Sequence, residues 1–97
     1  MRKLPKKLRI EGLNYKVKTK RHPRLQKGGE EYFGTECASK CAIVVKKNHP
    51  KQRQMSTLLH EVVHVIDYEL GLHLGEETIT RLGTGLFHVL RDNKLKV

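Results

Sequence analysis

The most constraining feature of the sequence is a long helical pattern that follows Pro50 and stops at Gly71. Proline suits the first turn of a helix, and glycine commonly follows the last turn. Apolar spacing of three and four residues between these two positions indicates one buried helical face. We therefore expect an amphipathic helix over about residues 51–70. Its expected buried residues are Met55, Leu58, Leu59, Val62, Val63 and Ile66.

Three residues of this helix, His60, Glu61 and His64, fit the pattern H-E-x-x-H. Residues four apart lie on one helical face, so both imidazoles can reach a single ion. Zinc suits imidazole nitrogen, and in catalytic sites it takes three protein ligands and a water. Glu61 would border that water and could accept its proton, while zinc polarises the scissile carbonyl. The pattern predicts a zinc metallopeptidase; the simpler alternative is two surface histidines on an ordinary helix.

A third metal ligand is expected from a second helix over about residues 76–92. This helix begins with Glu76 and Glu77, which follow His64 by 12 and 13 residues. Glu76 lies close to the apolar stripe expected on the helix, whereas Glu77 points roughly 160° away at ~100° per residue. Either acid could also stabilise the helix start through its dipole. The expected stripe consists of Ile79, Leu82, Gly83, Leu86 and Leu90.

Other polar residues near the motif are weaker candidates. Asp67 follows His64 by three residues and could orient a histidine ring, as metal sites often require. It could also be the third ligand itself, or a solvated acid. Tyr68, His73 and His88 are candidates for stabilising a developing oxyanion, and their spacing selects none of them.

The N-terminal half has the patterns of β-strands. Apolar and polar side chains alternate over residues 7–20, where Gly12 or Asn14 could turn the chain into a hairpin. A short strand is expected at Tyr32–Thr35 and a stronger, β-branched one at Cys41–Val45. A polar loop over residues 21–31 separates them from the hairpin.

These elements predict an α+β fold: a small antiparallel sheet of three to four strands, followed by two helices with the metal site between them. The 97 residues fit one domain spanning residues 1–97, with the basic strands in residues 1–50. A domain of this size buries only a modest core, so a bound metal could add noticeably to its stability.

Basic charge is concentrated in the N-terminal half of the chain. The net charge is +10, and residues 1–53 hold 16 Lys or Arg against 4 acids. Residues 54–97 hold 4 Lys or Arg against 6 acids. A basic half can keep a small protein soluble, or it can contact nucleic acid or an acidic partner. Composition alone does not choose among these roles.

Neither a membrane span nor a disulfide framework is expected. The longest apolar run, Ala42–Val45, is far too short to cross a bilayer, and no secretory signal follows Met1. We therefore expect a cytoplasmic protein. Cys37 and Cys41 would lie more than ~7 Å apart on an extended strand, so free thiols are expected. A metal site that joins them with His49 is the alternative.

The order of strands, H-E-x-x-H helix and Glu-led helix resembles small zincin metallopeptidases. The resemblance covers about residues 8–93, and its specific part includes Leu58–Asp67 and Leu74–Leu82. It is closest to minimal phage-type members related to the ImmA/IrrE-like and SprT-like families. The gap from the second histidine to the acid is shorter than in longer ImmA/IrrE-like members, and their Glu-Ala-Asn run is absent. Glu77 and Asp67 therefore stay open as third ligands.

The resemblance implies site roles and an activity. His60, His64 and Glu76 would hold zinc, and Glu61 would be the catalytic base. ImmA-like relatives cleave repressors of phages or mobile elements, and SprT-like relatives act on DNA-bound proteins. By analogy this chain would cleave a protein substrate, in the host cytoplasm if a phage encodes it. The alternative is a non-catalytic, zinc-stabilised basic module that binds nucleic acid or a phage protein.

Overall fold

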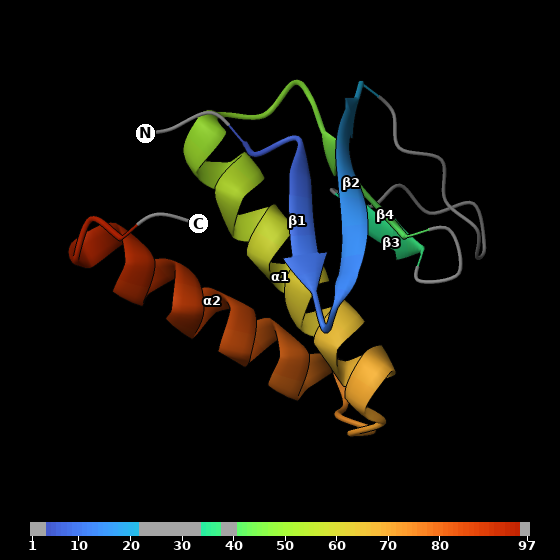
Figure 1. The fold of residues 1–97 in the computed structure, drawn as a ribbon. Coiled ribbons are helices and arrows are strands. Elements are labelled where there is room, and N and C mark those ends of the chain that lie inside the picture. Colours follow the sequence, from blue (N-terminus) through green and yellow to red (C-terminus); the bar gives the residue numbers. More distant parts are fainter. Residues whose placement is uncertain (1–3, 22–33, 38–40, 96–97) are drawn as a thin grey trace.

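The protein folds into a small sheet with two helices on one side of it (Figure 1). The computed structural model describes residues 4–21, 34–37 and 41–95, and only the backbone of residues 34–37. Its elements are β1 (Lys7–Ile10), β2 (Leu13–Lys20), β3 (Gly34–Cys37), β4 (Ala42–Lys46), α1 (Lys51–Leu70) and α2 (Glu76–Asp92). The α+β class predicted from the sequence is therefore confirmed.

The first two strands form the expected hairpin. β1 and β2 pair antiparallel, and Ile10 lies opposite Leu13 across the turn. Glu11 and Gly12 have φ of 48° and 81°. Positive φ at both central residues is the geometry of a two-residue hairpin turn that matches the twist of the strands. Gly12 thus makes the turn, whereas Asn14 lies within β2 and accepts a 3.3 Å hydrogen bond from Arg9.

The sheet is mixed, which corrects the expectation that all its pairs would be antiparallel. The strand order is β1-β2-β4-β3, and β2 pairs with β4 in parallel. The reason is that β3 lies at the outer edge and pairs antiparallel with β4. The chain thus passes over one strand position and returns through β4 in the direction of β2. Of the strand predicted at Tyr32–Thr35, the first two residues lie outside the described residues, as does nearly all of the predicted loop.

Both helices have the bounds that the sequence predicts, and α1 ends in a defined cap. Gly71 adopts the left-handed conformation, and its N–H reaches the Tyr68 carbonyl at 3.4 Å. The Leu72 N–H donates to the Asp67 carbonyl at 3.1 Å. This pair of bonds is the Schellman arrangement, which satisfies carbonyl groups at a helix end. The cap also starts the tight turn that leads into α2.

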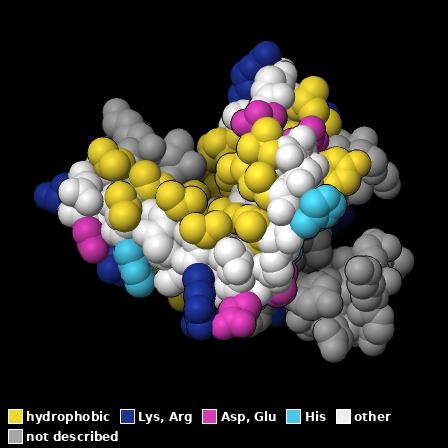
Figure 2. Space-filling model, turned by 90° about the horizontal axis from the view of Figure 1, so that it is seen from below, with side chains coloured by type: hydrophobic (Ala, Val, Ile, Leu, Met, Phe, Trp, Pro, Cys, Tyr) yellow, Lys and Arg dark blue, Asp and Glu magenta, His cyan; other side chains and the backbone are white. Residues whose placement is uncertain are grey.

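The buried stripe of α2 differs from the one predicted. Leu82 and Leu86 are 47% and 44% exposed, whereas Ile79, Gly83 and Phe87 are buried. The line of contact with α1 runs through Gly83, so its neighbours four residues away on each side are buried and the leucines lie beside that line. Figure 2 shows hydrophobic side chains gathered on the underside of the molecule, where Lys and Arg side chains are scattered.

The core lies between the inner face of the sheet and α1. Tyr15 is fully buried there, and its hydroxyl donates to a carboxylate oxygen of Glu69 on α1 at 2.9 Å. Neither described helix is long and apolar enough to span a membrane. The Cys37 side chain lies outside what the structure describes, so its predicted state stays a prediction. The core residues are Ile10, Tyr15, Ile43, Val45, Met55, Leu58, Leu59, Val65 and Phe87.

Candidate metal centre

Two histidines on α1 form the base of the candidate site. His60 and His64 lie one helical turn apart, and their ring centroids are 4.8 Å apart at an interplanar angle of 70°. Their side chains are about one quarter exposed, at 26% and 24%. The helix therefore presents both imidazoles on the face that meets the start of α2, as the spacing of the motif predicts.

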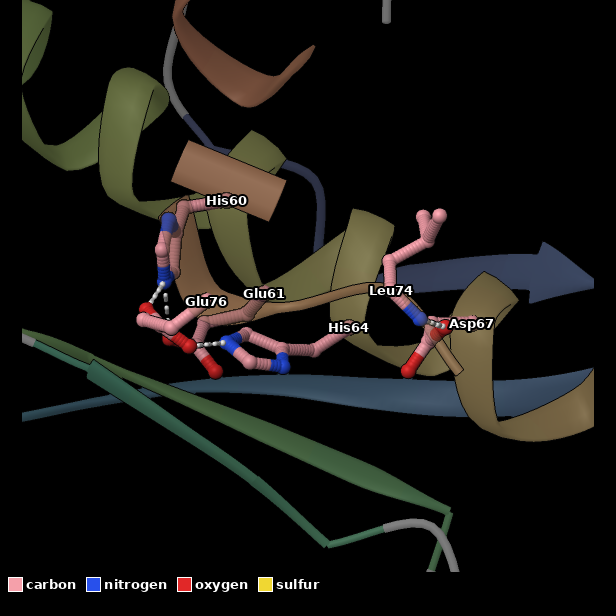
Figure 3. Close-up of polar contacts among 6 residues, drawn as sticks. All are labelled: His60, Glu61, His64, Asp67, Leu74 and Glu76. Atoms are coloured by element: carbon pink, nitrogen blue, oxygen red, sulfur yellow. Dashed lines mark hydrogen bonds and ion pairs between the residues drawn. The ribbon is translucent and has the colours of Figure 1, made fainter. Parts of the chain in front are cut away.

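The first residue of α2 completes the group. Nε2 of His60 lies 3.0 Å from Oε1 of Glu76, and Nε2 of His64 lies 2.9 Å from Oε2 of the same carboxylate (Figure 3). One ligand atom from each of the three residues lies within 4.8 Å of the others. Among the described residues, this is the only group of three or more His, Cys, Asp or Glu side chains with that property.

The two other acids considered as third ligands lie elsewhere. The carboxylate of Glu77 pairs with Arg81 one turn along α2, at 2.6 Å. Oδ1 of Asp67 accepts a 2.8 Å hydrogen bond from the Leu74 N–H, within the turn between the helices (Figure 3). Neither belongs to the group formed by the histidines. Glu76 thus lies on the face of α2 that meets the histidines and Glu77 does not, as their helical phases predict.

A close approach of the helices brings Glu76 to the histidines. A Cβ atom added to Gly83 would lie 3.0 Å from the Cα of His60, so any side chain at this crossing would press on the His60 backbone. Gly83 is seven residues after Glu76, which is close to two helical turns, so both lie on the face of α2 that meets α1. The sequence places Gly83 in the buried stripe but gives no signal of this contact with His60.

The turn between the helices fixes where α2 begins, and therefore where Glu76 lies along α1. It runs from the left-handed Gly71 to Gly75, and the Asp67 carboxylate holds the Leu74 amide two residues before Glu76. A hydrogen bond to a charged acceptor is stronger than one between neutral groups. Asp67 is therefore neither a member of the three-residue group nor a wholly solvated acid. It ties the end of α1 to the beginning of α2.

Glu61 is the one charged side chain that is buried among the described residues. The residue is 5% exposed, and its Oε1 lies 3.9 Å from Nε2 of His60. Figure 3 shows its carboxylate beside the two imidazoles and Glu76. Buried carboxylates are uncommon because ionised groups lose hydration energy on burial. A carboxylate kept at this position is suited to exchange a proton with a group bound between the histidines.

The three candidates for oxyanion stabilisation lie on different elements of the structure. Tyr68 is exposed and lies one turn beyond His64 on α1, and His73 is exposed in the turn between the helices. His88 lies near the end of α2, with its ring 6.0 Å from that of Phe87. The metal site suggested for Cys37, Cys41 and His49 is not tested, because the side chain of the first lies outside the described part.

No family model, curated protein or solved structure matches this chain.

Proposed function

We propose that the chain is a zinc-dependent metallopeptidase that hydrolyses peptide bonds of a protein substrate. The observation that carries this proposal is the convergence of two imidazoles and one carboxylate beside a buried second carboxylate. His60, His64 and Glu76 would hold the ion, and Glu61 would act as general base.

The donor set suits zinc in both chemistry and size. Two neutral imidazoles and one carboxylate are a known ligand set of catalytic zinc, which leaves a fourth position open. With metal–ligand bonds of about 2.0–2.1 Å, ligand atoms around a tetrahedral zinc lie about 3.4 Å apart. The two histidine–glutamate separations, 3.0 and 2.9 Å, are slightly shorter. Small outward movements of side chains would therefore make room for the ion, with no change in the helices.

The proposed reaction divides between the ion and Glu61. Bound zinc supplies Lewis-acid chemistry, which makes water more acidic and polarises a carbonyl group. Glu61 accepts a proton from the water that attacks the peptide carbonyl carbon. As the C–N bond breaks, the same carboxylate returns that proton to the leaving amine. The exposure of Glu76 (64% of its side chain) keeps the site accessible from solvent, as a protein substrate requires.

The sheet offers a place for the substrate backbone. Among the described strands β3 lies at the edge of the sheet, and it contacts α1, the helix that carries the histidines. An edge strand has one row of N–H and C=O groups without a neighbouring strand, and an extended peptide can pair with such a row. A substrate bound in this way would lie beside the strand that contacts the helix carrying His60 and His64.

The test measures zinc content and peptide cleavage separately. Elemental analysis should give about one zinc per chain for wild type and for Glu77→Ala, and almost none for Glu76→Ala. Glu61→Gln should keep the zinc and lose hydrolysis of fluorescein-labelled casein by about 10²–10⁴-fold, the usual contribution of a general base. Cleavage by Glu61→Gln at the wild-type rate would rule out the mechanism. Zinc retained by Glu76→Ala would rule out the ligand set.

The alternative, a zinc-stabilised module without catalysis, gives a different result. It also predicts zinc in the wild-type protein, but no cleavage by either wild type or Glu61→Gln. The buried carboxylate of Glu61 argues against it, because a purely structural site needs no base beside its ligands. Restored hydrolysis on adding zinc to metal-free wild type, but not to Glu61→Gln, would separate the two functions.

A further inference from the structure

The outer face of the sheet, opposite α1, carries a concentration of basic side chains. Side chains alternate between the two faces along a strand, so the residues that flank the buried Ile10 and Tyr15 point away from the core. The other outward positions with described side chains are Asn14, Ala42 and Val44, and none is acidic. We call the following residues the basic face: Lys7, Arg9, Lys16, Lys18, Lys20 and Lys46.

The strand register places like charges directly opposite one another on this face. Lys7 pairs with Lys16 between β1 and β2, and Lys20 pairs with Lys46 between β2 and β4. Like charges at opposed positions destabilise a sheet. Within the described part of the chain, no salt bridge joins Lys7, Lys16 or Lys20 to an acid. A polyanion bound to this face would relieve the repulsion between Lys7 and Lys16.

We propose that the basic face binds the phosphate backbone of double-stranded DNA without reading its sequence. Lys16, Lys18 and Lys20 follow one another at about 6.8 Å along β2, and neighbouring strands lie about 4.8 Å apart. The cations thus form a two-dimensional array. Duplex DNA carries one charge per ~1.7 Å of its axis, and it gains more from counterion release per contact than a single strand does.

The chemistry of the face favours this partner over others. Single-stranded nucleic acids are usually held by aromatic side chains that stack on bases, and the described members of the face include no aromatic residue. An acidic protein lacks the condensed counterions whose release strengthens binding to DNA. By contrast, the underside of the molecule carries a band of hydrophobic side chains with scattered cations (Figure 2).

The position of the basic face leaves the candidate metal centre free. The histidines lie on α1, which covers the inner face of the sheet, whereas the cations lie on the outer face. DNA bound to the cations would therefore not cover His60 or His64. The two sites can be occupied together, and a protein attached to the same DNA would be held near the molecule.

The test compares two triple variants with equal loss of charge. Lys16→Gln/Lys18→Gln/Lys20→Gln changes the basic face, and Lys51→Gln/Arg81→Gln/Lys94→Gln removes three exposed cations from the helices and the chain beyond α2. Fluorescence anisotropy of a labelled mixed-sequence duplex of about 20 bp gives the affinity between ~50 and ~200 mM salt. The sheet variant should lower the slope of log K against log salt by about 2.7, which is 0.9 for each lost contact. Its affinity should fall more than tenfold, and that of the control less than threefold.

Several results would overturn the proposal. One is an equal loss of duplex affinity in the two triple variants. Another is that wild type does not bind duplex at ~50 mM salt. The third is that wild type binds anionic lipid vesicles or polyglutamate more tightly than duplex. Should the sheet triple variant unfold, Lys7→Gln/Arg9→Gln on β1 gives a second test, with an expected slope change of about 1.8. Glu76→Ala should bind DNA like wild type, so failure of the zinc proposal would leave this result unaffected.

Discussion

The candidate metal centre and the basic face lie on opposite sides of one small core, and they depend on different physical features. At the metal centre, three side chains from two helices meet within 4.8 Å, so its geometry depends on a few close contacts. The basic face presents six cations from three strands, and its attraction for an anion is their sum. Loss of one contact should therefore matter greatly at the first region and little at the second.

This contrast predicts how each region responds to substitution. Changes that move α2 relative to α1 should alter zinc binding and leave DNA binding intact. Changes of single lysines on the sheet should lower the salt slope by about 0.9 each and leave zinc binding intact. A variant that changes both properties equally would show that the two regions are coupled through the core.

Outside the proposed ligands and base, the largest effect is expected from Gly83→Val. Its side chain would press against the His60 backbone, which a Cβ atom at position 83 already approaches to 3.0 Å. Overpacking of this kind costs about 1–3 kcal/mol in the free energy of unfolding. Because α2 must move away, zinc affinity should fall by about 10–100-fold, the equivalent of ~1.4–2.8 kcal/mol. Urea unfolding of the metal-free protein and competition with a zinc chelator measure the two effects.

Gly85→Val is the matched control for this variant. Gly85 lies on the same helix, and a Cβ atom there would meet nothing within 4 Å. Both substitutions change helix propensity in the same way, so their difference isolates the contact with His60. Equal stability and equal zinc affinity in the two variants would mean that the contact of position 83 with His60 does not set the separation of the helices. Duplex DNA binding should be unchanged in both.

A smaller effect on zinc binding is expected from Asp67→Ala. The substitution removes the acceptor that holds the Leu74 amide, so the turn before Glu76 becomes less well fixed. A hydrogen bond to a charged group contributes about 1.5–3 kcal/mol, and we expect about a tenfold loss of zinc affinity. Asp67→Asn keeps an oxygen acceptor and should recover most of it. Complete loss of zinc in Asp67→Ala, as in Glu76→Ala, would instead identify Asp67 as a ligand.

Much of the fold could be predicted because its signals are local. The α1 helix is bounded by Pro50 and Gly71, and the hairpin turns at Gly12, so nearby residues decide these elements. The spacing of His60 and His64 also fixes their shared face, and it depends on helical geometry alone. The position of Glu76 could be predicted in part, because its helical phase depends only on α2.

The remaining features depend on contacts between segments far apart in the sequence. The parallel pairing of β2 with β4 arises from the path of the chain to the edge strand β3, which no local pattern records. The exposure of Leu82 and Leu86 arises from the crossing point of the helices at Gly83. The opposed lysines of the basic face follow from strand register, which composition does not contain.

The smallest effect is expected from Tyr15→Phe, which removes a hydrogen bond between the sheet and α1. Tyr15 lies on β2 next to Lys16, and its buried hydroxyl donates to Glu69 on α1. Burial, and then the bond to Glu69, raise the pKa of the Tyr15 phenol well above its usual value. Tyr15→Phe should lower the free energy of unfolding by about 1.5 kcal/mol at neutral pH, the low end for a hydrogen bond to a charged group.

This difference in stability should shrink at high pH. Above about pH 10 the phenol ionises in the unfolded chain but stays protonated in the folded protein, so wild type loses stability as pH rises. Tyr15→Phe lacks this contribution, and the other tyrosines titrate alike in both proteins. The stability advantage of wild type should therefore shrink by about 1.4 kcal/mol between neutral pH and about pH 11, as urea unfolding over that range would measure. A constant difference over that range would mean that Tyr15 ionises as readily in the folded protein as in the unfolded chain, and that its bond to Glu69 does not join the sheet to the metal-site helix.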